Sequence, residues 1–372
     1  MRWYHRHSDV SRNARICAIH LALLGWFLSR TPGECADAPA APDARHGRVV
    51  VVQDSAATEA FEPRPDLVRA MVAAGISKFT GRTNIAAAWR LLVSTQDVVG
   101  IKVYCAPGAN SGTRPAVVEA IVEGLLTAKV PAKNIIIWDR QRSDLRLAGF
   151  DEIGERHGVL VEGALNAGFD EEAFYHPDRP ILGQLVFGDL EFGRNGEGIG
   201  RKSYVSKLLS KRITKIITVS PLLNHNSAGV CGNLFSLASG SVDNFIRFES
   251  DTFRLATAVP EIYALPQLSD RVALNVTDAL VCQYHGEQRS LLHYSVALNE
   301  LRFSKDPVAL DLLSLRDLDR QRQAAKDAPR SQSITNHMEL LQNASLLELG
   351  TADAEKIRIE RTASSDHGFR KR

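Results

Sequence analysis

Five segments of the chain place polar or charged side chains directly after short apolar runs, and the first is the richest. It reads CAPGANSGTRP, follows GIKVY, and contains Gly108, Ser111, Thr113 and Arg114. Glycine allows a backbone to approach a ligand closely, the hydroxyl groups can donate hydrogen bonds, and the guanidinium adds a fixed positive charge. These residue types predict a site for a carboxylate or phosphate group. The alternative is an ordinary turn in which Thr113 caps the following helix.

The other four segments add titratable groups. His225 stands among asparagine and serine residues before a glycine-rich stretch, where a neutral imidazole can meet a ligand. We expect His225 to act as a general base or ligand, with Asp139 or Asp278 orienting it; a structural histidine is the alternative. Asp306 also fits the N-cap of a helix that begins at Pro307. The residues of these segments that we expect near a ligand are Asp139, Arg140, Asn224, His225, Ser227, Gly229, Asp278 and Asp306.

Several well-known chemistries lack their motifs in this sequence. The G-x-G-x-x-G and G-x-x-x-x-G-K-[ST] patterns are absent, so no particular nucleotide is indicated, and G-x-S-x-G is absent as well. H-E-x-x-H does not occur, so no metal site is predicted. Cys105, Cys231 and Cys282 have no C-x-x-C spacing, so no iron–sulfur cluster is expected, and the cofactor is left open.

These groups would have to be positioned by a parallel sheet. Runs such as RVVVVQ, VVGIKVY, NIIIWD, ITKIITVS and RVALNVTDAL are rich in valine and isoleucine, which is typical of strands covered on both faces. RPAVVEAIVEGLLTAKV has helical spacing between two of them, which predicts a right-handed crossover. We therefore predict one α/β domain over residues 48–362, with a mostly parallel β-sheet, helices on both faces and an irregular insertion at about 165–203. Ligands bind such sheets beyond the carboxyl ends of the strands.

The N-terminal region reads as a targeting segment. Basic residues precede the short apolar run ICAIHLALLGWFLS, and ECADA follows it, so residues 1–38 are predicted to be a signal peptide and residues 39–47 a linker rich in alanine and proline. The protein would then be exported, periplasmic or secreted, with no stable membrane span after cleavage; an uncleaved N-terminal anchor is the alternative. Residues 363–372 are read as a basic tail.

The overall charge indicates no polyanionic partner. Removing the five arginines and three acids of residues 1–38 from the 45 basic and 43 acidic residues of the chain leaves equal numbers of each. A nucleic-acid surface is therefore not expected. A small-molecule anion is the expected partner, and the oligomeric state is left open.

Five blocks resemble, in order, the domain-of-unknown-function 362 family, from about Arg48 to Thr362. They are GIKVYCAPGANSGTRPAVVEAIVEGLLTAKVPAKNIIIWDR, ITVSPLLNHNSAGVCGNL, VTDAL, KDPVALD and LLELGTADAEKIRIER. The activity of that family is largely unassigned, many relatives look exported, and some carry ferredoxin-type cysteine clusters that this chain lacks. The resemblance implies functional positions at Lys102, Thr113, Asp139, Arg140, His225, Gly229, Asp278 and Asp306.

The chain departs from that family at two places. Tyr104 stands where relatives often have asparagine, and Leu223-Asn224 stand where they often have Lys-Asp before the histidine. If that Lys–Asp pair serves the relatives' ligand, the activity of this chain is altered or lost. The sequence thus predicts an exported enzyme whose anion-accepting crevice takes a small carboxylated or phosphorylated compound. The alternatives are a non-catalytic ligand-binding protein and an accessory factor in a redox or assembly pathway.

Overall fold

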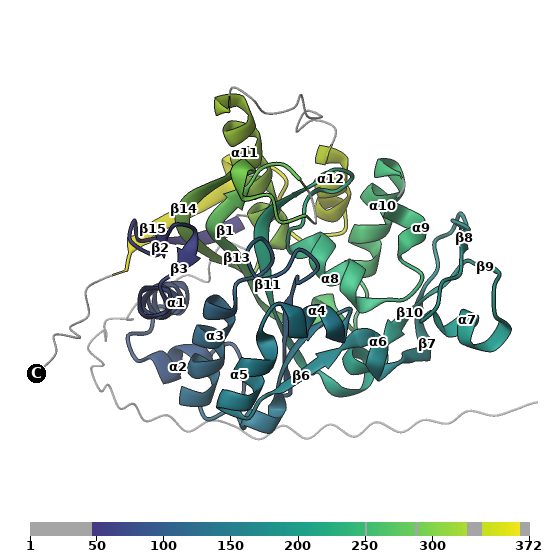
Figure 1. The fold of residues 1–372 in the computed structure, drawn as a ribbon, viewed down its shortest axis with the longest axis horizontal. Helices are drawn as coiled ribbons and strands as arrows, with labels where there is room; N and C mark the ends of the chain where they lie inside the picture. The colour runs from purple at the N-terminus through teal and green to yellow at the C-terminus, as the bar shows by residue number, and fades with distance from the viewer. Residues whose placement is uncertain (1–46, 250, 287–288, 326–336, 365–372) are drawn as a thin grey trace, which may run out of the picture. The chain divides into compact units, whose positions relative to one another are not determined.

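The computed structural model describes residues 47–249, 251–286, 289–325 and 337–364, which share one mixed sheet. Eight strands follow one another across it, and the short β12 (Gly229–Val230) pairs with β11 only (Figure 1). Among these eight strands only β14 runs antiparallel to its neighbours, so the predicted mostly parallel sheet is confirmed. The strand order is β15 (Ile357–Ala363), β1 (Gly47–Gln53), β14 (Ser295–Ser304), β13 (Val272–Gln283), β11 (Lys215–His225), β4 (Val99–Val103), β5 (Ile135–Asp139) and β6 (Leu160–Gly163).

Helices cover both faces of this sheet, as the sequence predicts. Side chains alternate between the faces, so Ile137 of β5 joins one core and its neighbour Trp138 the other. The first core is closed by α1 (Pro65–Thr80), α2 (Ile85–Arg90), α3 (Pro115–Thr127) and α5 (Phe150–His157). The second is closed by α8 (Asn233–Ser241), α10 (Thr252–Tyr263), α11 (Pro307–Ala324) and α12 (Met338–Leu346).

The unit β4–α3–β5 forms as its spacing predicts. α3 begins at Pro115, whose missing N–H is not needed in the first turn, and it buries Val117, Ile121 and Leu125 at helical spacing. β4 and β5 pair in parallel, with Lys102 opposite Trp138. One shorter helix and one hairpin complete this half of the fold: α4 (Arg142–Leu147) follows β5, and β2 (Thr58–Glu59) pairs with β3 (Glu62–Pro63).

Residues 164–206 form two small antiparallel ribbons outside the main sheet. β7 (Phe169–Tyr175) pairs with β10 (Ser203–Ser206), and β8 (Gly183–Gln184) pairs with β9 (Ile199–Gly200). The connecting helices are α6 (Ala164–Ala167) and α7 (Leu190–Asn195), and the ribbons lie beside α9 (Ile246–Glu249) and α10 (Figure 1). This segment, which we call the insertion, covers the predicted 165–203 region and includes β10.

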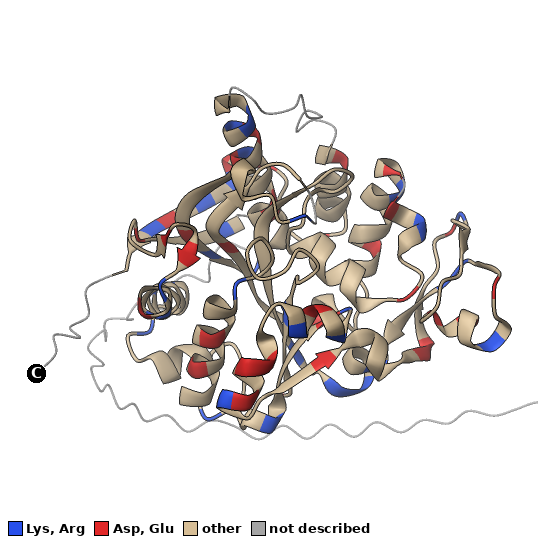
Figure 2. Ribbon diagram, in the orientation of Figure 1, with Lys and Arg blue, Asp and Glu red and all other residues tan. Residues whose placement is uncertain are grey.

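The signal peptide, most of the linker and residues 365–372 of the basic tail lie outside the described residues. Within the described ranges, no helix combines the length and the apolar composition needed to cross a bilayer. Acidic and basic residues are interspersed over the described elements (Figure 2).

Candidate functional site

The four predicted strand ends lie at one level of the sheet, but only β4 and β5 end there, because β11 and β13 continue to His225 and Gln283. β13, β11, β4 and β5 are successive neighbours in the sheet, and Val103 lies opposite Val219 while Ser220 lies opposite Thr277. Parallel pairing brings four polar residues, on or directly after these strands, to one level of the sheet. They are Tyr104, Asp139, Ser220 and Asp278.

Asp306 does not belong to this group, and its predicted place there is wrong. It follows β14, the one antiparallel strand, so it lies toward the opposite end of the parallel strands, near Asn275. Its carboxylate accepts from Ala309 N at 2.8 Å and from Thr351 N at 2.9 Å. Asp306 is therefore the cap of α11, as the alternative reading of the sequence had it.

The strand ends do not face an open crevice, because α8 packs over them. α8 is buried along nearly its whole length. Its first residues are held by Asp311, whose carboxylate accepts from Asn233 N at 2.8 Å and from Leu234 N at 3.0 Å. A negative charge at this position suits a helix N-terminus. Burial nevertheless raises the pKa of Asp311 to about 7.

Lys102 and Asp139 form a closed hydrogen-bond network beneath α8. Lys102 Nζ donates to Asp139 Oδ1 at 2.9 Å, to Val103 O at 2.5 Å and to Ser236 Oγ at 3.1 Å. The other carboxylate oxygen, Asp139 Oδ2, accepts from Cys105 N at 2.7 Å. All three ammonium protons therefore have acceptors, and the pair ties β4, β5 and α8 together.

The loop after β4 also uses its polar groups internally. Thr113 Oγ1 accepts from Tyr104 N at 2.9 Å and donates to Val219 O at 2.6 Å. Asp278 Oδ2 accepts from Arg114 N at 3.0 Å and from Arg114 Nη1 at 3.2 Å. The guanidinium that we expected to hold an anion thus already has a carboxylate.

The other two predicted residues of this loop, Ser111 and Gly108, also have structural roles. Ser111 Oγ donates to Gln283 Oε1 at 2.6 Å, which joins the loop to the end of β13. Gly108 has a φ of 81°, a left-handed conformation that favours glycine, so its place in the turn is conformational. The contacts of this loop favour the structural alternative over an anion cradle.

The backbone orients the Nδ1 side of the His225 ring. Nδ1 accepts from Ala228 N at 3.0 Å and from Ser227 N at 3.3 Å, so we assign the proton of the neutral ring to Nε2. The ring packs on Phe235 of α8, with 4.3 Å between centroids. Protonation of Nδ1 would break both backbone contacts, so this geometry favours a neutral donor over a base. The oxygens of Asp139 and Asp278 serve other groups instead.

Other predicted residues shape the turn that holds this ring. Asn224 Nδ2 donates to Asn226 Oδ1 at 3.3 Å, and Ser227 Oγ donates to Glu249 O at 3.2 Å. Gly229 has a φ of 83°, and His337 packs where its Cβ would lie. Asn224, Ser227 and Gly229 thus position His225.

Among the predicted cations at these strand ends, Arg140 alone has no carboxylate partner within the described ranges, since Lys102 pairs with Asp139 and Arg114 with Asp278. Nη1 donates to Val242 O at 2.5 Å and to Ser239 O at 3.2 Å. Within the described ranges Arg140 has no carboxylate at ion-pair distance, and its Nε and Nη2 make no hydrogen bond. The side chain is partly exposed, and burial of the rest lowers its pKa.

Arg140 and His225 approach the same face of α8. His225 packs on Phe235 and Arg140 bonds the carbonyl of Ser239, which is one helical turn, roughly 6 Å, further along. Tyr104, which directly follows β4, has its ring 6.2 Å from that of Phe235. We call Tyr104, Arg140, His225 and the facing turn of α8 the α8 site.

Two buried donors under α8 lack partners. Ser220 Oγ and Trp138 Nε1 are buried on the sheet face that α8 covers and have no hydrogen-bond partner. Burial in turn raises the pKa of Tyr104, and nearby Cys231 raises it further. Phe235, Cys231 and the unpaired Ser220 hydroxyl were not predicted as site residues, because only the packing of α8 brings them there.

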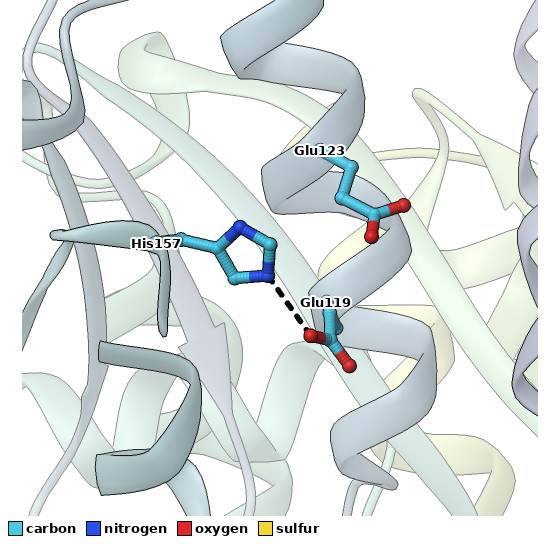
Figure 3. Close-up of side chains that lie close together, drawn as sticks. All are labelled: Glu119, Glu123 and His157. Carbon is cyan, nitrogen blue, oxygen red and sulfur yellow. Dashed lines mark hydrogen bonds and ion pairs between the residues drawn. The ribbon is translucent and has the colours of Figure 1, made fainter. Parts of the chain in front are cut away.

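A separate cluster of possible metal ligands lies on the other face of the sheet. Glu119 and Glu123 are one turn apart on α3, and His157 Nε2 is 2.9 Å from Glu119 Oε1 (Figure 3). Arg69 bonds Glu123 at 2.5 Å and Arg156 bonds Glu119, so arginines already neutralise both carboxylates. Burial would raise the pKa of Glu119, but the bonds from His157 and Arg156 outweigh it and lower the pKa. We interpret the cluster as an ion-pair network between α3 and α5.

Comparisons with known proteins add little. No family model and no curated protein matches the chain. One solved structure, a protein from Thermotoga maritima, matches with 13% identity and a TM-score of 0.34. The match covers 59% of this chain and 51% of that one, so the chain spans about half the length of the Thermotoga protein. The resemblance to the domain-of-unknown-function 362 family stays a prediction.

Proposed function

We propose that this chain is an exported protein that binds a small carboxylated or phosphorylated compound at the α8 site and acts on it as an enzyme. The observation that carries the proposal is that Arg140 and His225 both contact α8, at points one helical turn apart. One residue is a cation with unused donors, and the other is an oriented imidazole. Such a pair can hold an anionic group and polarise an oxygen of the same molecule.

Arg140 would hold the anion. Its guanidinium is anchored by two backbone carbonyl oxygens, which fix its position without neutralising its charge. Arginine can bind a carboxylate or phosphate through two parallel hydrogen bonds, and a partly dehydrated guanidinium binds it more strongly than one in water. Arg114, by contrast, is already paired with Asp278.

His225 would donate a hydrogen bond from Nε2 to a substrate oxygen, in exchange for a contact that the residue makes within the chain. The two backbone N–H groups at Nδ1 favour this tautomer and disfavour the imidazolium. A neutral imidazole can stabilise negative charge that develops on a carbonyl oxygen. In this proposal His225 acts as a hydrogen-bond donor, and not as the general base that the sequence predicted.

A non-catalytic binding protein is the second candidate. The same observation favours it, because a histidine held as a donor serves binding as well as catalysis. The two candidates differ in what His225→Gln changes. An enzyme loses turnover with a small change in affinity, whereas a binding protein loses affinity and forms no product.

Native mass spectrometry of the purified chain, followed by denaturation, tests the proposal. We expect a retained small anion in the wild type and its loss from Arg140→Met. Arg90→Met is the matched control, because Arg90 is exposed on α2, on the other face of the sheet. Equal retention by Arg140→Met and Arg90→Met would place the compound elsewhere and refute the assignment of Arg140.

A further inference from the structure

A second arginine is buried where the insertion meets α9. Arg247 lies on α9 and is 6% exposed. The insertion packs against it from two strands: Ser203 of β10 accepts a hydrogen bond from Arg247 Nη2 at 2.9 Å, and a Cβ on Gly183 of β8 would lie 2.3 Å from Arg247 Cβ. The guanidinium carbon is 4.6 Å from the ring centroid of Phe248.

Most of this guanidinium has no partner. Among the described residues, Arg247 Nε and Nη1 are buried without a hydrogen-bond partner, and no ion pair involves Arg247. Burial also lowers the pKa of Arg247 to about 10. An unpaired buried charge with two unmet donors is costly to a folded protein, and such groups commonly contact an ion or ordered water.

Three acids, Asp243, Glu191 and Asp189, lie near enough to Arg247 to stabilise its charge, and two of them bond backbone amides of the insertion or its neighbours. Asp243 accepts from Leu190 N at 2.8 Å and from Tyr204 N at 2.5 Å. Asp189 accepts from Val186 N and Asn244 N, both at 2.8 Å. These two carboxylates fasten the insertion to the chain between α8 and α9, so they act on the guanidinium charge without bonding to it.

We propose that Arg247 forms a second binding site, for a small oxyanion such as a carboxylate or phosphate group, which joins the insertion to α9. The oxyanion accepts from the Arg247 nitrogens that lack partners. Since Ser203, Gly183 and Arg247 belong to different elements, an anion bound here stabilises the docked insertion. This site is separate from the α8 site and does not depend on the function proposed above.

Thermal unfolding of the purified chain tests the inference, with inorganic phosphate and acetate as probes at constant ionic strength. Every protein carries Arg140→Met, so that binding at the α8 site does not contribute. We expect one probe or both to raise the midpoint by a few degrees, saturably, when Arg247 is present. A response to phosphate alone identifies a phosphate site, and a response to acetate identifies a carboxylate site.

Arg247→Met should abolish this response. The midpoint in probe-free buffer should stay unchanged or rise, because the methionine side chain has a similar shape and the substitution removes an unpaired buried charge. Arg201→Met, in the exposed link between β9 and β10, is the matched control and should respond like its parent. If Arg247→Met does not fold, Arg247→Gln keeps a donor for Ser203 and serves in its place. A response that persists in the Arg247 variants, or its absence when Arg247 is present, overturns the proposal.

Discussion

Removing the carboxylate of Asp311 should release α8 from the sheet. Asp311 is buried and accepts from Asn233 N and Leu234 N, the first two amides of the helix. Asp311→Ala leaves both donors buried without an acceptor, at about 1–3 kcal/mol each, so the expected loss in free energy of unfolding is about 2–6 kcal/mol. Urea unfolding at neutral pH measures it as a lower midpoint with an unchanged m-value. A loss below about 1 kcal/mol would refute this anchoring.

The same residue predicts a pH dependence. Burial raises the pKa of Asp311 from 3.8 to about 7 in the folded state, so between those values the folded protein holds a proton that the unfolded chain releases. Its contribution to stability is therefore complete near pH 4 and is lost as the pH rises to 7, by at most about 4 kcal/mol. Asp311→Asn should flatten this part of the curve, and Asp270→Asn, at an exposed aspartate, should not. Parallel curves for Asp311→Asn and the wild type would show that Asp311 does not titrate in this window.

Three further changes test the packing around the α8 site. Gly240→Ala places a methyl group 2.3 Å from Lys102 Cε and should cost about 1–3 kcal/mol in thermal unfolding, whereas Gly193→Ala, in open space, should not destabilise. Thr113→Val removes the hydrogen bonds to Tyr104 N and Val219 O and should cost about 1–3 kcal/mol in urea without changing ligand affinity; a pure loss of affinity would restore the anion-loop hypothesis. Glu119→Gln should lower stability by about 1 kcal/mol or less, with no change on adding zinc or on chelation; a metal-dependent shift would contradict the ion-pair interpretation.

The strands, and the polar residues that lie together on them, could be predicted because a strand's signal lies within its own short segment. Val99–Val103 and Ile135–Asp139 are short β-branched runs on either side of a helix with a clear apolar stripe, and a parallel pair follows from that arrangement. The cap at Asp306 has a local signal as well, since proline follows it directly. The direction of β14 could not be predicted from the sequence, because it depends on the pairing of this strand with β13 and β1.

α8 could not be predicted for a physical reason. NLFSLASGS contains three serines and a glycine, which are weak helix formers, and the helix is buried all round, so it has no apolar stripe to detect. Without α8, Lys102, Thr113 and Arg114 look available to a ligand, because nothing in their own segments shows that Ser236, Val219 and Asp278 take up their hydrogen bonds. The unused donors of Arg140 and Arg247 are likewise properties of packing alone.

A double-mutant cycle on ligand affinity tests the central claim most directly. The probes are acetate, succinate, inorganic phosphate and glycerol 3-phosphate, and the tightest binder is carried through Arg140→Met, His225→Gln and the double variant by calorimetry. If one molecule contacts both residues, each change weakens binding and the two effects are not additive, differing from their sum by about 0.5 kcal/mol or more. Dissociation constants that neither substitution alters would contradict the claim that Arg140 and His225 form one site.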